Sequence, residues 1–378
     1  MKEKICIVEL YNHHEVVNAL CTLYLYAGYD VAIFAEKKVI DNIRAVEFDQ
    51  FIKSSKESQK GFITRHSGQL QKADLVIFTT IVKHPKFFAQ FNFSAPIILL
   101  IHDGNFYLRP KESLKIIGLR TFARWLKFWV CRESKYRIKL LQKVSFISFA
   151  DDFIADYLSK EILVNNLNVL PALPLSFFEG QSPHYNPIQI IIPGSIQPTR
   201  DYLTVISAFK QIQHLITQPI EIILLGSGNS SFGQNTISQF RELAGTQIKI
   251  IAQKHSFSQE DYDQYLAQAR LAIIPIKQDF VGGIFKEKYG KTKITGSIND
   301  VIRFGTPTFI SSHYPFPADL SKLFTPFTNS LDLQKHILEH LETAKIHPIS
   351  NLENYRLEER SKKLAHITNL ALKKRKLH

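Results

Sequence analysis

The chain has 378 residues with a net charge of +13, and 45% of them are hydrophobic and 21% charged, which excludes a disordered, collagen-like or repetitive protein and fits two domains of roughly 150 to 200 residues. No segment approaches the roughly 20 apolar residues of a membrane-spanning helix, and no signal-peptide pattern precedes the first apolar segment, so we expect a cytoplasmic protein with only peripheral membrane contacts. The three cysteines lie far apart in the sequence, which argues against a disulfide framework or a zinc site.

The first half of the chain alternates strands and helices. Lys4–Leu10 has the continuous apolar character of a buried strand, and apolar residues at helical spacing predict a helix over Glu15–Tyr26. Alternating strands and helices indicate a parallel, doubly wound sheet. Further strands are expected at Asp30–Ala35, Asp74–Thr79, Ala95–His102 and Val144–Phe149.

Four polar residues stand where two of these strands end. His14 and Glu15 follow the first strand, and His102 and Asp103 end the strand that begins at Ala95. Open α/β sheets bind ligands at the carboxyl ends of their strands, and a histidine oriented by a carboxylate can act as a general base. Both pairs are therefore candidate catalytic residues. The same residues also suit a helix cap or a turn, and the sequence leaves this alternative open.

The positive charge is concentrated in one segment. Between Arg109 and Lys143, eleven basic residues stand against Glu112 and Glu133, a balance of +9 that leaves +4 for the rest of the chain. An apolar stripe at helical spacing, a basic face and intervening aromatic residues predict an amphipathic helix at a membrane surface. Packing in the core would explain the stripe but not the charge, and no nucleic-acid-binding module surrounds it. The expected membrane-facing residues are Arg120, Arg124, Trp125, Lys127 and Trp129.

A proline-rich stretch separates this half from a second series of strands and helices. Leu170–Pro187 contains four prolines and no sustained period, as expected for a linker. We therefore predict one Rossmann-like domain over residues 1–175, a second over 176–345 and a helix over 346–378 that packs toward the first domain. The second series includes strands at Ile188–Pro193, Ile220–Leu225, Gln247–Ala252, Leu271–Ile276 and Thr306–Ser311, and helices at Asp201–Leu215, Gln259–Ala269 and Ser297–Phe304.

Four motifs in the second half occur in a characteristic order. They are PGSIQPTRDYLTVISAF at 193–209, IEIILLGSG at 220–228, KIIAQKHSFSQEDYDQYLAQARLAIIPI at 249–276 and NDVIRFGTPTFIS at 299–311. In order and spacing they resemble the donor-binding domain of GT-B glycosyltransferases related to the retaining, sugar-nucleotide-dependent class. The resemblance implies an α/β fold in which two Rossmann-like, doubly wound domains face a central cleft. It also implies that residues 1–175 bind the acceptor and residues 176–345 bind the nucleotide-sugar donor.

The resemblance also implies a set of donor-binding residues, with departures from the family pattern. Ser195 stands where the family has an arginine, and Arg200 stands where it has a lysine. Thr292 and Asp300 stand where the family has two glutamates, so the stereochemical outcome stays open, and Glu287 is a candidate substitute for the missing acid. The implied donor-binding residues are Gly194, Arg200, Gly226, Gly228, Glu287, Lys293, Thr295, Gly296, Ser297 and Asp300.

The start of the helix near Ser297 suits a diphosphate. Backbone N–H groups at a helix start carry partial positive charge, Thr295 and Ser297 offer hydroxyls, and Lys293 and Arg200 supply cations. A tight turn at Gly226–Gly228 and a plain capped helix are the simpler readings of the same residues.

The expected function is transfer of a sugar from a nucleotide-activated donor to a hydroxyl of a membrane-associated or lipid-linked acceptor, in assembly of envelope polysaccharide. We expect a metal-independent enzyme at the inner face of the membrane, with no cofactor besides the nucleotide-sugar co-substrate and no nucleic-acid partner. The alternatives are a catalytically degenerate scaffold of the same fold and a nucleotide-sugar-modifying enzyme such as an epimerase.

Overall fold

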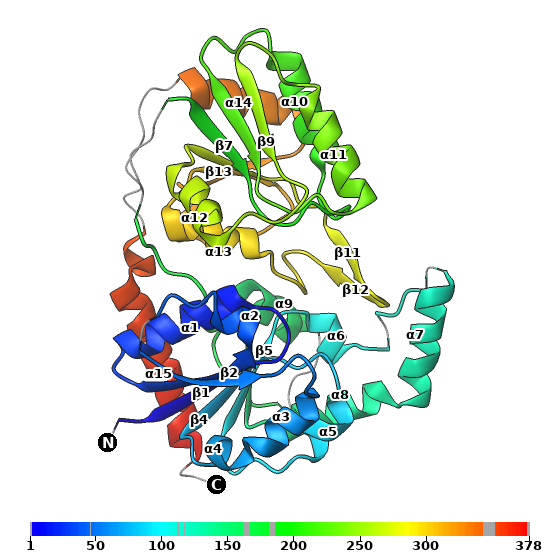
Figure 1. The fold of residues 1–378 in the computed structure, drawn as a ribbon, viewed down its shortest axis with the longest axis vertical. Helices are drawn as coiled ribbons and strands as arrows, with labels where there is room; N and C mark the ends of the chain where they lie inside the picture. The colour runs from blue at the N-terminus through cyan, green and yellow to red at the C-terminus, as the bar shows by residue number, and fades with distance from the viewer. Residues whose placement is uncertain are drawn as a thin grey trace. The chain divides into compact units, whose positions relative to one another are not determined.

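The computed structural model describes residues 2–45, 47–111, 113–116, 118–161, 167–180, 186–342 and 352–375. The chain divides into two compact units. Unit 1 comprises Met1–Leu175, Phe280–Ile294 and Leu357–His378, and unit 2 comprises Ser176–Asp279 and Thr295–Arg356. Each unit contains a six-stranded parallel sheet with helices on its faces (Figure 1). The predicted α/β class with two Rossmann-like domains is confirmed.

Unit 1 contains the strands β1 (Lys4–Glu9), β2 (Asp30–Glu36), β3 (Asp49–Lys53), β4 (Leu75–Thr80), β5 (Ile97–Ile101) and β6 (Phe146–Phe149). They lie in the order β3-β2-β1-β4-β5-β6, and every neighbouring pair is parallel. The chain extends one side of the sheet from β1 to β3 and then returns to place β4 beside β1. Such a reversal between two strands is where open α/β sheets bind ligands.

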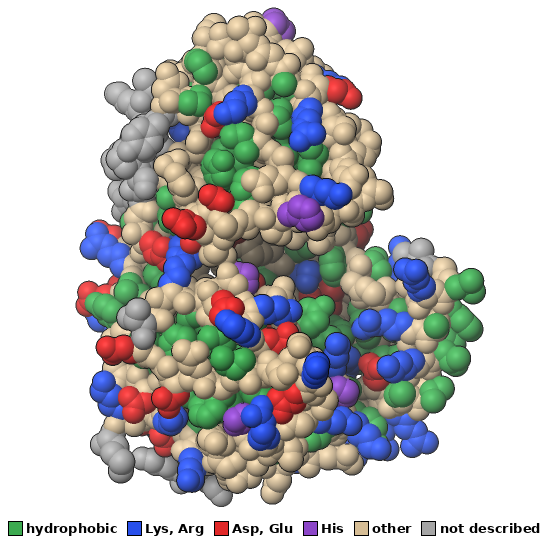
Figure 2. All heavy atoms as spheres, in the orientation of Figure 1, with side chains coloured by type: hydrophobic (Ala, Val, Ile, Leu, Met, Phe, Trp, Pro, Cys, Tyr) green, Lys and Arg blue, Asp and Glu red, His purple; other side chains and the backbone are tan. Residues whose placement is uncertain are grey.

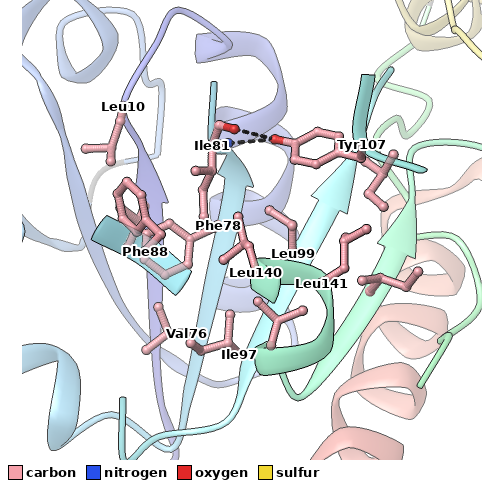
Figure 3. Packing of buried hydrophobic residues seen from close by; sticks show 14 of the residues in the cluster. Leu10, Val76, Phe78, Ile81, Phe88, Ile97, Leu99, Tyr107, Leu140 and Leu141 are labelled. Atoms are coloured by element: carbon pink, nitrogen blue, oxygen red, sulfur yellow. Dashed lines mark hydrogen bonds between the residues drawn. The ribbon is translucent and has the colours of Figure 1, made fainter. Parts of the chain in front are cut away.

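The core of unit 1 forms because its central strands are apolar on both faces. All six residues of β4 and all five of β5 are buried, as parallel sheets covered by helices require. Figure 3 shows Phe78, Leu99 and Leu140 packed in this cluster. Tyr107 belongs to the same cluster. Its hydroxyl donates to the carbonyl of Ile81 over 2.8 Å and accepts from the amide of Ile81 over 3.0 Å, which satisfies these buried polar groups.

The helices of unit 1 are α1 (His14–Tyr26), α2 (Lys37–Ile40), α3 (Gln59–Arg65), α4 (Ser67–Gln71), α5 (Pro85–Gln90), α6 (Gly104–Leu108), α7 (Leu119–Val130), α8 (Glu133–Lys143), α9 (Asp152–Glu161) and α15 (Leu357–Arg375). The last helix packs on the first, where the hydroxyls of Tyr24 and Thr368 are 2.9 Å apart in the core. The limit that the sequence suggested at residues 345 and 346 lies outside the described residues. No helix of the described chain is long and apolar enough to cross a membrane.

One segment belongs to a different unit from the one the sequence suggested. Strands β11 (Asp279–Gly282) and β12 (Phe285–Lys288) form a two-stranded sheet, and residues Phe280–Ile294 belong to unit 1. The reason is apolar burial: Phe285 is 3% exposed, and its ring lies 5.0 Å from that of Phe106 and 5.7 Å from that of Phe128. Assigning the whole of 176–345 to the second domain therefore differs from the structure.

Unit 2 repeats the architecture with the strands β7 (Ile188–Ile192), β8 (Ile220–Leu224), β9 (Ile248–Ala252), β10 (Leu271–Ile274), β13 (Thr308–Ser311) and β14 (Phe324–Phe327). Their order is β14-β13-β10-β7-β8-β9, with every neighbouring pair parallel, so the reversal lies between β7 and β10. The α-helices are α10 (Tyr202–Ile212), α11 (Ser231–Arg241), α12 (Gln259–Gln268), α13 (Gly296–Phe304) and α14 (Ser330–Glu342).

Candidate functional site

In unit 2, two glycines bring bare backbone together where β7 and β8 end. Gly194 has φ +85°, and a Cβ there would overlap the guanidinium of Arg200 and lie 2.6 Å from Oγ of Ser297. Gly226 is equally confined, because a Cβ would lie 2.6 Å from the amide nitrogen of Ile196. Only glycine fits either position without displacing its neighbours. Both glycines lie at the carboxyl edge of the sheet, next to the reversal.

Arg200 is a buried cation at this edge. Its side chain is tied by hydrogen bonds from Nε to the carbonyl of Ser195 over 3.1 Å and from Nη2 to Oγ of Ser297 over 2.8 Å. Arg200 is 9% exposed, and its Nη1 is buried without a partner among the described residues. A buried guanidinium with an unmatched nitrogen is a costly arrangement unless an anion is bound nearby.

The first turn of α13 follows directly. Thr295 is the N-cap residue, yet its side chain makes no capping hydrogen bond and the first turn contains no acidic residue. A Cβ added at Gly296 would meet nothing within 4 Å, so the space beside this turn is open. The first N–H groups of a helix have no intrahelical partner. An open helix start beside a buried arginine is an arrangement that can bind a diphosphate.

Two other predicted donor residues of unit 2 have structural partners. Asp300 accepts a 2.8 Å hydrogen bond from the hydroxyl of Tyr262, and burial together with the Asp300 charge raises the pKa of Tyr262 well above its usual value. Gly228 donates its amide to the carbonyl of Gln253 over 3.1 Å, as part of the turn after β8. Asp300 lies within α13, and Gly228 follows β8 at the carboxyl edge of the sheet.

The remaining predicted donor residues, Lys293 and Glu287, lie in unit 1. Lys293 forms an ion pair with Asp103, and its Nζ stands 4.6 Å from the centre of the Phe280 ring. The sequence joined Lys293 to the start of α13, whereas the structure gives it Asp103 as its partner. Two of the predicted sites are therefore linked in a way that the motif order did not indicate.

Glu287 is a buried carboxylate that receives backbone hydrogen bonds. It is 2% exposed and accepts from the amides of Asn105 over 3.1 Å and Phe106 over 2.8 Å, at the start of α6. Burial, together with the nearby charge of Asp103, raises its pKa to about 7. Nearby, Oγ1 of Thr292 accepts from the amide of Lys288 over 2.8 Å. Glu287 therefore holds α6 and the 280–294 segment together.

At the carboxyl edge of the sheet in unit 1, His13 rather than His14 faces His102. The rings of His13 and His102 are stacked, with centroids 4.8 Å apart and planes 10° apart. Glu15 lies beside both N-terminal histidines: its Oε1 is 3.4 Å from Nδ1 of His13, and its Oε2 is 3.5 Å from Nδ1 of His14. The structure thus brings together Glu15, His102 and a histidine that the sequence analysis did not select.

The two stacked histidines have opposite electrostatic surroundings. Burial disfavours the charged form of His13, but the hydrogen bond to Glu15 and the charges of Glu9 and Glu15 outweigh it and raise its pKa. Burial lowers the pKa of His102 to about 3, aided by the charges of His13 and Lys293. Its Nε2 is buried without a partner among the described residues. His102 is therefore neutral at pH 7, whereas the pKa of His13 lies above the usual value for a histidine.

One local feature explains the choice of His13. Helix α1 begins at His14, so His13 is its N-cap residue and lies on the turn that leaves the strand. Another missed residue, Glu9, is completely buried, accepts the amide of Tyr11, and accepts the Thr79 hydroxyl over 2.5 Å. The adjacent histidines and the glutamate two positions after His13 were the only sequence signal for this arrangement.

Helix α7 is amphipathic, and its apolar stripe is exposed. Leu119, Phe122, Leu126 and Val130 are 87%, 47%, 49% and 73% exposed, while Phe128 is the buried residue that anchors the helix. The core explanation for the stripe is therefore wrong. Figure 1 shows α7 standing apart from the sheet of unit 1, and Figure 2 shows hydrophobic and basic side chains together on that side of the view. None of the described acidic residues forms an ion pair with the basic residues Arg120, Arg124 and Lys127 of this helix.

No protein-family model and no curated protein sequence matches the chain. Solved structures do match it over nearly its whole length. A glycosyltransferase from Rickettsia africae is 12% identical over 98% of this chain and 99% of that chain, with a TM-score of 0.61. HepE from Anabaena, in complex with UDP, is 13% identical over 98% and 100%, with a TM-score of 0.59.

A protein described as a UDP-N-acetylglucosamine 2-epimerase, from Listeria monocytogenes, is also similar. It is 11% identical over 96% of this chain and 95% of that chain, with a TM-score of 0.52. At this level of identity the similarity establishes the fold. The chain has the GT-B fold, two Rossmann-like units in one polypeptide.

Proposed function

We propose that the protein is a glycosyltransferase that moves a sugar from a nucleotide-activated donor to a hydroxyl group. The observation that carries this proposal is the buried Arg200 hydrogen-bonded to Ser297 at the open start of α13. The GT-B fold supports it, since several proteins of similar fold are glycosyltransferases. HepE is solved with UDP, so a uridine nucleotide is the first donor class to test.

In the proposed donor site, unit 2 binds the diphosphate. The phosphate oxygens accept hydrogen bonds from the first N–H groups of α13 and from the hydroxyl of Thr295, while the Ser297 hydroxyl positions Arg200. Arg200 compensates the negative charge. When the bond between the anomeric carbon and the diphosphate oxygen breaks, the bonding electrons leave with the diphosphate. Groups that are already oriented toward this charge stabilise the transition state most effectively. The proposal requires no metal ion.

In the proposed catalytic site, unit 1 accepts the proton of the acceptor hydroxyl. His13 is our preferred base, because Glu15 orients its ring and stabilises the imidazolium that forms. His14 contacts the same carboxylate and stays the alternative base. The neutral His102 packs against His13, and Asp103 offsets the charge of Lys293 close to both rings. The new bond forms between the acceptor oxygen and the anomeric carbon.

The acceptor in this proposal is lipid-linked or otherwise at a membrane surface. Helix α7 supports this, because its exposed apolar stripe can enter the interface while Arg120, Arg124 and Lys127, which pair with no acidic residue of the described chain, can face anionic headgroups. Trp125 and Trp129 are neighbours on the same helix with their rings edge to face, and tryptophan favours the interface. The protein would act in the cytoplasm at the inner face of the membrane, in assembly of envelope polysaccharide.

The decisive experiment separates transfer from its alternatives. Purified protein is incubated with nucleotide sugars, with and without lipid-linked saccharide acceptors from membrane extracts. A glycosylated acceptor and free nucleoside diphosphate are expected. Conversion of the nucleotide sugar without an acceptor would favour the epimerase, a candidate kept because of the Listeria structure. Nucleotide binding without any turnover over the full panel would favour a scaffold. A thermal-shift screen selects the nucleotide first, because a ligand of the folded state raises apparent stability.

A further inference from the structure

Unit 1 contains a cavity to which the proposed function assigns no ligand. It has a volume of about 290 Å³ and opens beside the carboxyl ends of β1 and β2. Its lining includes Tyr11 and Asn12 after β1, Glu36 and Lys38 after β2, Gln59 of α3, and Lys83 after β4. Its volume is close to the lower limit of small-molecule sites, roughly 300 Å³.

Hydrogen bonds fix the backbone of the loop after β1, which lines this cavity. The buried carboxylate of Glu9 accepts the amide of Tyr11, and Nε2 of Gln59 donates to the carbonyl of Leu10 over 2.6 Å. Tyr11 is nevertheless 49% exposed. A fixed backbone with an exposed aromatic ring offers a sugar a flat apolar surface, which costs little entropy to order on binding.

The charges of the lining leave a positive balance. Glu36 is paired twice, with Lys38 at 3.5 Å and with the buried Lys53 at 3.2 Å. Lys83 is exposed and has no acidic partner among the described residues. Amide, phenol and ammonium groups together suit a ligand with several hydroxyls and a negative charge.

The cavity also adjoins the proposed base. The ring centroid of Tyr11 lies 6.3 Å from that of His13. A sugar that packs on Tyr11 therefore has a hydroxyl within reach of His13 directly or through one water molecule. We propose that this cavity binds the acceptor, and that the acceptor saccharide carries an anionic group, a carboxylate or a phosphate, that Lys83 recognises. This inference rests on the proposed function.

The test measures saccharide binding to the full-length protein without any nucleotide. The probes are methyl glucuronoside, glucose 6-phosphate, neutral methyl glucoside and inorganic phosphate, followed by calorimetry or ligand-observed NMR. At least one anionic sugar should bind about tenfold more tightly than the neutral sugar, as one charged hydrogen bond predicts. The two anionic probes distinguish a carboxylate from a phosphate as the recognised group.

Variants locate the binding. Lys83→Gln should abolish the preference for the anionic sugar, and Tyr11→Ala should weaken every sugar. The control is Lys86→Gln, an exposed lysine of α5 outside the cavity, which should change nothing. Equal binding of charged and neutral sugars, or binding of inorganic phosphate as tight as that of the sugar phosphate, would overturn the inference.

The nucleotide provides an independent readout. UDP binding, measured separately, should be unaffected by Lys83→Gln, because Arg200 and α13 belong to unit 2. If the protein turns over a nucleotide sugar but the anionic saccharides do not bind at the cavity, only this inference fails. If they bind there but no sugar is transferred, the cavity stands as a saccharide site and the proposed function fails.

Discussion

Nη2 of Arg200 donates a hydrogen bond to Oγ of Ser297 over 2.8 Å, and the same hydroxyl donates to the carbonyl of Pro193 over 3.1 Å. One serine thereby connects the loop after β7 to the first turn of α13. Because Gly194 leaves room for both side chains, a cation and a helix start meet at one edge of the sheet.

The first prediction concerns this connection. Arg200→Ala should weaken UDP binding by about 1.5 to 3 kcal/mol, the range for a hydrogen bond to a charged group, and should leave uridine binding nearly unchanged. Titration calorimetry with both ligands measures the difference. Arg241→Ala, which removes an exposed arginine of α11, is the matched control. Wild-type affinity of Arg200→Ala for UDP would place the diphosphate elsewhere.

The second prediction separates Lys293 from the donor site. Since Lys293 pairs with Asp103 in unit 1, Lys293→Ala should change UDP affinity by less than about twofold while lowering turnover. A loss of UDP affinity as large as that of Arg200→Ala would instead restore the assignment that the motif order suggested.

The third prediction concerns the base. His13→Ala should lower turnover about a hundredfold or more with nucleotide binding intact, and a larger loss than that of His14→Ala would distinguish the two histidines. Because a base must be neutral, kcat/KM should rise with pH through the raised pKa of His13. Glu15→Gln removes the charge that stabilises the imidazolium, so the rise should move to lower pH. A rise at the same pH in both proteins would exclude His13 as the titrating group.

The fourth prediction uses the buried carboxylate of Glu287. Its pKa is raised from 4.5 to about 7, so the folded state favours the protonated form. Its stabilising contribution is complete below pH 4.5 and is lost as pH rises through about 7. The thermal unfolding temperature of Glu287→Gln should therefore fall less between pH 5 and pH 8 than that of wild type. Glu260→Gln, at an exposed position on α12, should follow the wild-type curve.

The fifth prediction tests α7. Arg120→Glu with Arg124→Glu should reduce co-sedimentation with anionic liposomes, and added salt should reduce wild-type binding, because salt screens attraction to headgroups. Leu119→Ser with Val130→Ser should weaken the binding that persists at high salt. The control, Lys210→Glu with Lys335→Glu, makes the same charge change in unit 2. Equal pelleting of all variants on neutral and anionic vesicles would refute a membrane role for α7.

The sequence predicted most of the fold because its central strands are continuous apolar runs between turn residues. It did not predict β3, whose exposed edge residues make DQFIK resemble a loop, or α11, whose polar face dominates SFGQNTISQFR. The site was harder to predict. The partners of Ile284 and Phe285 are more than a hundred residues distant in the chain, so nothing local could show that the 280–294 segment packs in unit 1. For the same reason the pairing of Lys293 with Asp103 was not foreseen.

The path of the chain has a practical consequence for dissecting the molecule. The polypeptide passes between the two units four times, after residues 175, 279, 294 and 356. A fragment that stops at Leu175 would lack Phe285, leaving Phe106 and Phe128 without a ring that each contacts, and would lack the carboxylate at the start of α6. The complementary fragment would expose Ile284 and Phe285 to water, and exposed apolar surface of this kind promotes aggregation. Halves expressed separately should therefore misfold, because the cut at residue 175 separates the 280–294 segment from the core of unit 1.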